Sequence, residues 1–229
     1  LHGAAMGFVG MHSRDLTFRH FDMYRDEAHP RYVTNNADPI HTFGCYGKIL
    51  IEDCRMDSML DDSLNVHGNF TVAESAGGDM ILARSPGKGM TNRMKNYLSG
   101  TRIGVFNGQT IEEKLTLTVK TCEPYPDDER VFRITTEEDA SGVNAGDLIE
   151  NLSGNADVTV RNCEFGRFRG TMRIQTRGKV LIENCSFANS GDSVIFTGDS
   201  VYWYESGPVR DVTLRNCRFG GAVNACPEV

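Results

Sequence analysis

The sequence predicts an all-β fold: a right-handed parallel β-helix that carries a small antiparallel β-barrel or sandwich as an insertion. Three observations lead to this prediction. One segment recurs along the chain, and its copies follow a regular short spacing. A long stretch that lacks this repeat pattern interrupts the spacing once. Helix content is expected to be low, because no window of about 11 residues or more keeps a 3.6-residue apolar period.

The recurring segment joins an alternating strand to a polar residue, a small cysteine and a large apolar residue. Successive strand residues point to opposite faces, so this alternation predicts short strands with one buried face. A fifth copy, Asp15–Met23, has Phe21 in place of the cysteine. The four copies with a cysteine are KILIEDCRM (Lys48–Met56), DVTVRNCEF (Asp157–Phe165), KVLIENCSF (Lys179–Phe187) and DVTLRNCRF (Asp211–Phe219).

The spacing of the copies indicates stacked coils. Cys163 and Cys185 are separated by one period of about 22 residues. The intervals from Cys185 to Cys217 and from Phe21 to Cys54 are each longer by about ten residues, which is typical of a solenoid with side loops. Equivalent side chains then form ladders. We expect the cysteines to be free, buried thiols, because equivalent inward positions rarely have disulfide geometry.

One interval breaks the period and predicts an inserted domain. The interval from Cys54 to Cys163 is several periods long, and the sequence between them contains short apolar runs separated by Gly, Pro, Asn and acidic turns. We therefore expect residues 1–68 to form the first coils, residues 69–151 a small inserted β domain, and residues 152–229 the second set of coils.

Composition and charge exclude several kinds of partner. The chain has 24 Lys and Arg against 31 Asp and Glu, a net charge of −7, which argues against nucleic acid and an anionic membrane surface. No run approaches the roughly 20 apolar residues of a membrane helix. The seven cysteines include no C-x-x-C pair, so a zinc ribbon is not expected.

Three carboxylates are the main candidates for chemistry. The interval from Asp38 to Asp61 is close to one coil, so Asp38 is expected below the Asp61 and Asp62 pair on one wall. Crowded carboxylates repel each other, which raises at least one pKa. Glycoside hydrolysis needs such a set: one acid protonates the leaving oxygen, and one carboxylate activates water or attacks carbon. Two alternatives are solvated turns and a calcium site.

Polar residues beside these carboxylates are candidate substrate contacts. His41, Asn65 and His67 lie in the same two segments, NNADPIHTFGC and MLDDSLNVHG. We expect hydrogen bonds to sugar hydroxyls or to the carboxylates, with ordinary turn residues as the alternative. The histidine spacing does not favour a metal pair.

Two further segments contribute candidates for substrate binding. GDSVYWYESG contains Asp199, Trp203 and Glu205; an aromatic face stacks on sugar C–H surfaces, and carboxylates accept hydrogen bonds from hydroxyls. The alternative is an aromatic cluster that packs a loop. RFRGTMRI offers Arg169 to a polar substrate, although a surface arginine often has no specific role.

Three parts of the sequence together resemble one enzyme family. HGAAMGFVG, NNADPIHTFGCYGKILIEDC and MLDDSLNVHGNF resemble the catalytic core of glycoside hydrolase family 110, the α-1,3-galactosidases. TRGKVLIENCSFANSGDSVIFTGDSVYWYESGPVRDVTLRNCRF resembles the C-terminal coils of that family, and the segment ending NAGDLIENLS resembles its barrel insertion. The combination D-x-x-H with L-D-D-x-x-N-V-H-G is fairly specific, whereas the N-C-x-F repeat occurs in many β-helix proteins.

The resemblance implies exo-acting removal of terminal α-1,3-linked galactose, with inversion and without a cofactor or a metal. It makes Asp38, Asp61 and Asp62 the candidate catalytic carboxylates and Trp203–Gly207 a substrate-side element. The implied partner is a glycan ending in α-galactose, at a bacterial secreted or periplasmic location, since complex glycans lie outside the cytoplasm. Family members are much longer, so we expect a piece of a longer protein, and unpaired strand edges on a terminal coil favour a homo-oligomer.

Two other functions are weighed against this one. A β-helix hydrolase or lyase of different specificity would act on other polysaccharides, but the acidic wall disfavours a polyanionic substrate. A non-catalytic, adhesin-like β-helix would bind glycans without cleaving them. Substitution of Asp61 and Asp62 by Asn separates these functions. A glycan-binding protein keeps its binding, whereas the enzyme loses hydrolysis of an α-galactoside while its fold and sugar binding remain.

Overall fold

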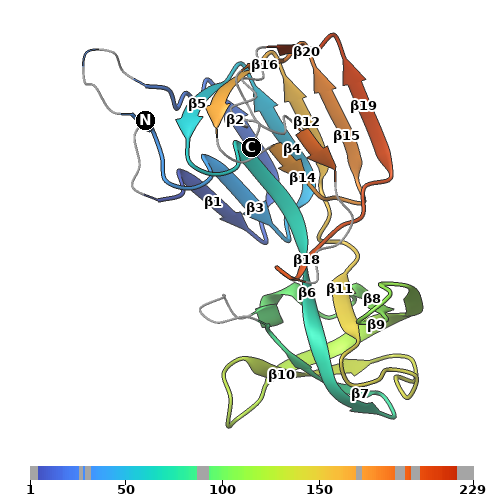
Figure 1. Ribbon diagram of the computed structural model, residues 1–229. Coiled ribbons are helices and arrows are strands. Elements are labelled where there is room, and N and C mark those ends of the chain that lie inside the picture. The colour runs from blue at the N-terminus through green and yellow to red at the C-terminus, as the bar shows by residue number, and fades with distance from the viewer. Residues whose placement is uncertain are drawn as a thin grey trace, which may run out of the picture. The chain divides into compact units, whose positions relative to one another are not determined.

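The computed structural model describes residues 5–25, 28, 32–86, 93–168, 172–188, 194–196 and 202–220 (Figure 1). In these ranges the regular structure consists of strands and one short 3₁₀ helix, η1 (Arg93–Asn96), so the prediction of an all-β protein with little helix is confirmed. No helix in these ranges has the length and apolar character needed to cross a membrane.

The chain forms two compact units. The first comprises Leu1–His67, Ala156–Thr197 and Pro208–Val229, and the second comprises Gly68–Asn155 and Gly198–Gly207.

The first unit contains three sheets whose described strand pairings are all parallel. In the later coils the chain contributes one strand to each sheet in turn before it returns to the first, whereas the first coil has no described strand in the third sheet. The first sheet contains β1 (Phe8–Met11), β3 (Ile40–Phe43), the start of β6 (Leu64–Gly77), β14 (Met172–Ile174) and β17 (Val194–Phe196). The second contains β2 (Arg14–Arg19), β4 (Tyr46–Glu52), β12 (Asp157–Arg161), β15 (Lys179–Glu183) and β19 (Asp211–Arg215). The third contains β5 (Arg55–Met59), β13 (Glu164–Phe168), β16 (Ser186–Ala188) and β20 (Arg218–Gly220).

Each copy of the repeat supplies a strand of the second sheet, a sharp turn and a strand of the third sheet. The residue before the cysteine adopts a left-handed conformation, with φ of 54° at Asp53 and Asn162 and 53° at Asn184 and Asn216. Asp and Asn tolerate this conformation better than other residues with a side chain. Their side chains also bond between coils: Asn162 Nδ2 donates to Asp53 Oδ1 at 3.1 Å, and Asn184 Nδ2 donates to Asn162 Oδ1 at 3.3 Å.

The repeat cysteines line the inside of these turns. Cys54, Cys163 and Cys185 are buried and Cys217 is half-buried, and all four are free thiols, so the prediction of thiols rather than disulfides is confirmed. The thiol of Cys163 donates to the carbonyl of Arg161, with sulfur and oxygen 3.1 Å apart. Small thiols fill this ladder and cap strand-end carbonyls.

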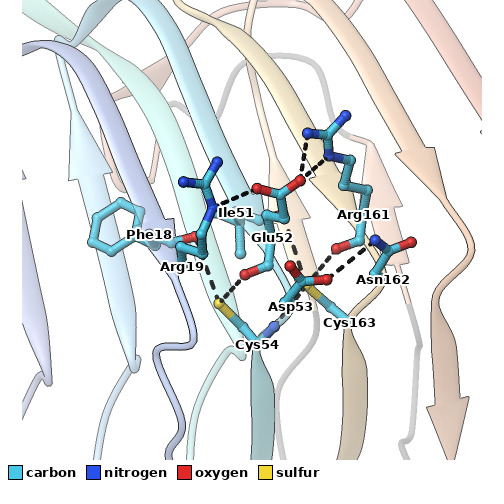
Figure 2. A network of polar contacts seen from close by, with 9 residues as sticks. All are labelled: Phe18, Arg19, Ile51, Glu52, Asp53, Cys54, Arg161, Asn162 and Cys163. Atoms are coloured by element: carbon cyan, nitrogen blue, oxygen red, sulfur yellow. Dashed lines mark hydrogen bonds and ion pairs between the residues drawn. The ribbon is translucent and has the colours of Figure 1, made fainter.

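An ion-pair network crosses the same coils at the carboxyl ends of three strands of the second sheet (Figure 2). Glu52 accepts hydrogen bonds from Arg19 Nε at 2.6 Å and from Arg161 Nε at 2.5 Å, so one carboxylate joins three neighbouring strands. The hydrogen bond from Arg19 is the main reason that the pKa of Glu52 is lowered, and Arg161 adds to the effect.

Large apolar side chains form the core of the first unit. The rings of Phe165 and Phe187 stack with centroids 5.2 Å apart, and those of Phe187 and Phe219 stack at 4.9 Å. Each is the last residue of a repeat copy, so identical sequence positions become layers of one ladder.

In the second unit the described strands pair antiparallel, and the pairings close into a ring. The ring runs through the later part of β6, β11 (Leu148–Asn151), β8 (Arg102–Phe106), β9 (Glu113–Pro124), β10 (Val131–Thr136) and β7 (Met80–Arg84), and β7 pairs back with β6. A short strand, β18 (Glu205–Ser206), pairs with β6 at Asn69 and Gly68. The inside is apolar, with Ile81, Phe132 and Ile149 among its fully buried side chains.

Candidate active site

Parallel register brings the three predicted carboxylates together in the first unit. Asp38 precedes β3, and Asp61 and Asp62 precede β6; these two strands pair with His41 opposite Asn65. The same register, continued back along both segments, makes Asp62 the residue level with Asp38. One carboxylate oxygen from each of the three aspartates lies within 4.8 Å of the others.

The three carboxylates differ in their surroundings. Asp38 is only 4% exposed, Asp62 is also buried, and Asp61 is exposed. The amide of Asp62 donates to Asp61 Oδ1 at 3.1 Å, which orients the Asp61 carboxylate. Arg173 Nε lies 3.4 Å from Asp62 Oδ2 and places a positive charge beside the cluster.

The surroundings of Asp38 favour the protonated form of its carboxyl more than water does. Burial raises the pKa of Asp38, because a low-dielectric site disfavours the charged form. The hydrogen bond with His41 opposes this shift, and the charges of Asp61 and Asp62 add to it. The net direction is upward, as expected for a general acid.

Two histidines continue from Asp38 in a hydrogen-bonded chain. His41 Nδ1 lies 2.6 Å from Asp38 Oδ2, and His41 Nε2 lies 3.0 Å from His67 Nε2. His67 is stacked against Phe43, with ring centroids 5.8 Å apart. The chain can pass a proton between Asp38 and the imidazoles.

One ladder of polar side chains crosses the first sheet beside the carboxylates. His41 is level with Asn65, and Asn65 is level with Arg173 on β14. Arg173 is absent from the residues that sequence reasoning selected. The pattern of Met172–Ile174, apolar–Arg–apolar, marks it as the outward residue of a strand, but the insertion hides which coil it joins.

Four predicted substrate residues are not among the described residues of the first unit. Trp203 and Glu205 belong to the second unit, where Trp203 is exposed and Glu205 is buried. Arg169 and Asp199 lie outside the described residues. Their roles remain predictions.

Among the described residues, this carboxylate cluster is the group whose spacing would suit the ligands of a metal ion. Three oxygens within 4.8 Å of one another could surround a hard cation that takes carboxylate ligands. Arg173 already compensates part of the negative charge, as a cation would.

No protein-family model matches the chain. It is 31% identical over 221 residues to Alpha-1,3-galactosidase B of Bacteroides thetaiotaomicron, covering 95% of this chain and 35% of the relative. It is 29% identical to Alpha-1,3-galactosidase A of Bacteroides fragilis (96% of this chain, 36% of the relative). It is 28% identical to Alpha-1,3-galactosidase A of Akkermansia muciniphila (96% and 37%).

The chain thus spans little more than a third of the length of these curated relatives. Along nearly its whole length, it is similar to glycoside hydrolases that are named α-1,3-galactosidases.

Proposed function

We propose that this chain belongs to an exo-acting glycoside hydrolase of family 110, which removes terminal α-1,3-linked galactose from glycans. The observation that carries the proposal is the cluster of Asp38, Asp61 and Asp62, with oxygens within 4.8 Å and unequal surroundings. The names of the relatives supply the sugar and the linkage. They do not favour the lyase or the non-catalytic alternative.

In this proposal Asp38 is the general acid. Its carboxyl is buried and its pKa is raised, which favours the protonated form that can give a proton to the oxygen of the departing sugar. Asp61 or Asp62 is the general base that takes a proton from the attacking water. Asp61 is open to solvent, and Asp62 lies beside the Arg173 guanidinium.

We propose inversion at the anomeric carbon, which the family resemblance implies. The spacing of the cluster is not what supports it: the nearest oxygens lie within 4.8 Å, whereas an inverting pair is typically about 6.5–9.5 Å apart and a retaining pair about 5–5.5 Å. The anomer released first therefore tests the mechanism separately from the substrate.

We also propose that the first unit is a right-handed parallel β-helix. Three parallel sheets that are visited in turn support the helix, and the strong right-handed preference of parallel crossovers supports the hand. The substrate class favours a secreted or periplasmic location.

The test is release of galactose from an α-1,3-linked galactosyl disaccharide, compared with the α-1,4 and α-1,6 isomers. We expect hydrolysis of the α-1,3 isomer alone, and proton NMR during the first turnovers should show β-galactose. Hydrolysis of another isomer would contradict the linkage, and α-galactose as the first product would contradict inversion alone.

A further inference from the structure

The buried position of Asp38 raises the question of how this carboxyl recovers a proton. In the proposed hydrolysis with inversion, the general acid gives one proton to the departing sugar in each turnover and has to regain one before the next. Asp38 is 4% exposed, so water has little direct access to its carboxyl. A proton that returns to Asp38 therefore needs a route through neighbouring groups.

Two imidazoles lie in line with this carboxyl. His41 and Phe43 lie on one face of β3, and Asn65 and His67 lie on the matching face of β6, so the two histidines are diagonal neighbours. The planes of their rings are 88° apart, and Nε2 of one ring lies 3.0 Å from Nε2 of the other. A hydrogen bond rather than a stacking contact therefore joins the two rings.

Phe43 fixes the orientation of both imidazoles. Its ring is stacked with that of His67, with the two planes 17° apart, and His67 is 5% exposed. The ring of His41 meets Phe43 edge to face, with centroids 6.0 Å apart. The line from Asp38 through His41 to His67 is thus held by packing as well as by its hydrogen bonds.

The two hydrogen bonds of this line allow two arrangements of protons when both rings are neutral. When Asp38 is ionised, His41 donates through Nδ1 to the carboxylate and accepts at Nε2 from His67. When Asp38 is protonated, its carboxyl donates to Nδ1 of His41, His41 donates through Nε2, and His67 carries its own proton on Nδ1. The change from the first arrangement to the second takes up one proton at His67 and delivers one to Asp38.

The charges that face the line favour a proton at its Asp38 end. Burial has the largest effect in raising the pKa of Asp38, and the charges of Asp61 and Asp62 raise it further, against the hydrogen bond with His41. Arg173, on the next coil, has its Nε 3.4 Å from Oδ2 of Asp62. Its positive charge therefore lies beside Asp62 and not beside the acid.

We propose that His41 and His67 form a proton relay that returns a proton to Asp38 after each turnover. Nδ1 of His67 takes a proton from water or buffer, the Nε2 proton of His67 moves to Nε2 of His41, and the Nδ1 proton of His41 moves to Oδ2 of Asp38. The proton that the general base took from the attacking water leaves to solvent, so protons and charge balance over one turnover. Both histidines act through Asp38 and are positioning residues.

This relay rests on the proposed function. An inverting hydrolase leaves its acid without a proton when the products depart, whereas the acid of a retaining enzyme regains a proton from the water that completes the reaction. The relay is therefore needed only for inversion.

Two substitutions each keep one hydrogen bond of the line and interrupt proton transfer. In His41→Asn the amide nitrogen takes the place of Nδ1 and still donates to Asp38, but the shorter side chain does not reach His67. In His67→Gln the amide takes the place of Nε2 and still bonds to His41, but it does not pass a proton on. His20→Gln, at an exposed histidine after β2, is the control for the same chemical change.

The kinetic readout separates proton return from sugar binding. We expect kcat for the α-1,3-linked disaccharide to fall about tenfold or more in both variants, while kcat/KM changes less than about twofold, because proton return follows the release of products. Rapid-quench assays should show a burst of about one galactose per enzyme in the variants only. His20→Gln should match the wild type. Low buffer concentration and EDTA keep other acids and divalent cations from replacing the relay.

The wild type provides a test that needs no substitution. Long-range ¹H–¹⁵N NMR correlations show which nitrogen of each imidazole carries a proton, and they can be followed from about pH 9 to pH 5. As pH falls, Nε2 of His41 should gain a proton and the proton of His67 should move from Nε2 to Nδ1 in the same transition. Rings that change at separate pH values, or that do not change, would overturn the relay.

The relay and the proposed function fail in different ways. Folded variants with wild-type kcat and no burst overturn the relay and leave the hydrolase proposal standing. A raised KM with a lowered kcat/KM and no burst also overturns the relay, because it assigns the histidines to sugar binding. Release of α-galactose as the first product overturns inversion and the relay together. A wild-type chain that releases no galactose contradicts the proposed function itself.

Discussion

Nδ1 of His41 lies 2.6 Å from Oδ2 of Asp38, so the most buried carboxyl of the cluster is bonded to an imidazole rather than to a cation. The other ring nitrogen of His41 faces His67 at 3.0 Å. The contact with Nδ1 orients the Asp38 carboxyl. An arginine in place of the imidazole would instead hold that carboxyl permanently ionised.

Asp38→Asn is expected to lower hydrolysis of the α-1,3-linked disaccharide by about 10²–10⁴-fold, because the departing sugar loses its proton donor. An aryl α-galactoside with a strongly acidic phenol should lose much less, since that leaving group needs no proton. Rates on both substrates provide the measurement. Asp211→Asn, on an exposed strand, is the matched control. Equal losses on the two substrates would contradict the acid role.

The raised pKa of Asp38 also predicts a pH-dependent cost in stability. Between the ordinary pKa of aspartate and the raised value, the folded protein binds more protons than the unfolded chain, so its free energy of unfolding falls as pH rises through this window. Asp38→Asn cannot ionise, so its stability relative to the wild type should increase with pH. Urea unfolding from about pH 4 to pH 7 measures this difference. A difference that stays constant with pH would contradict the assignment.

Asp61→Asn and Asp62→Asn should identify the base. We expect one of them to lose about 10²–10⁴-fold in kcat while it still binds galactose. Added azide should restore turnover in that variant alone, because azide replaces water and needs no deprotonation. Product formation with and without azide is the measurement. Full activity in both variants would mean that neither Asp61 nor Asp62 is the general base.

The Glu52 network predicts the opposite pH dependence. Its hydrogen bonds with Arg19 and Arg161 lower the pKa of Glu52, so its stabilisation is present above the ordinary glutamate pKa and is lost as pH falls through the lowered value. Glu52→Gln should therefore be less stable than the wild type at neutral pH, with the gap closing in acid. Thermal unfolding against pH tests this, with the exposed Glu164→Gln as control.

The phenylalanine ladder offers a matched pair of core substitutions. Phe187 is buried between two rings, and Phe219 at the end of the stack is 51% exposed. Phe187→Ala should cost about 3–5 kcal/mol of unfolding free energy, and Phe219→Ala about 1 kcal/mol or less. Urea unfolding of both variants measures these costs. Similar costs would mean that the terminal ring is covered as well as the central one.

Much of the first unit follows from features that are local or periodic. Alternating residues in Lys48–Met56 and its copies predict the strands, Asp53 and Asn162 suit the left-handed turn, and the recurring cysteines predict a ladder of free thiols. The meeting of Asp38 with Asp61 and Asp62 also follows, because neighbouring coils repeat at nearly constant spacing. These features are properties of short segments, which the sequence determines by itself.

Only the tertiary structure decided the partners that join these segments. Arg173 meets Asp62, and Arg93 meets Tyr204, each across 111 residues. The first of these contacts spans the insertion, which breaks the period, so counting residues from Asp62 cannot reach Arg173. The second joins a 3₁₀ helix to a segment whose strand pairs with β6, and such long-range pairing is encoded by no local pattern.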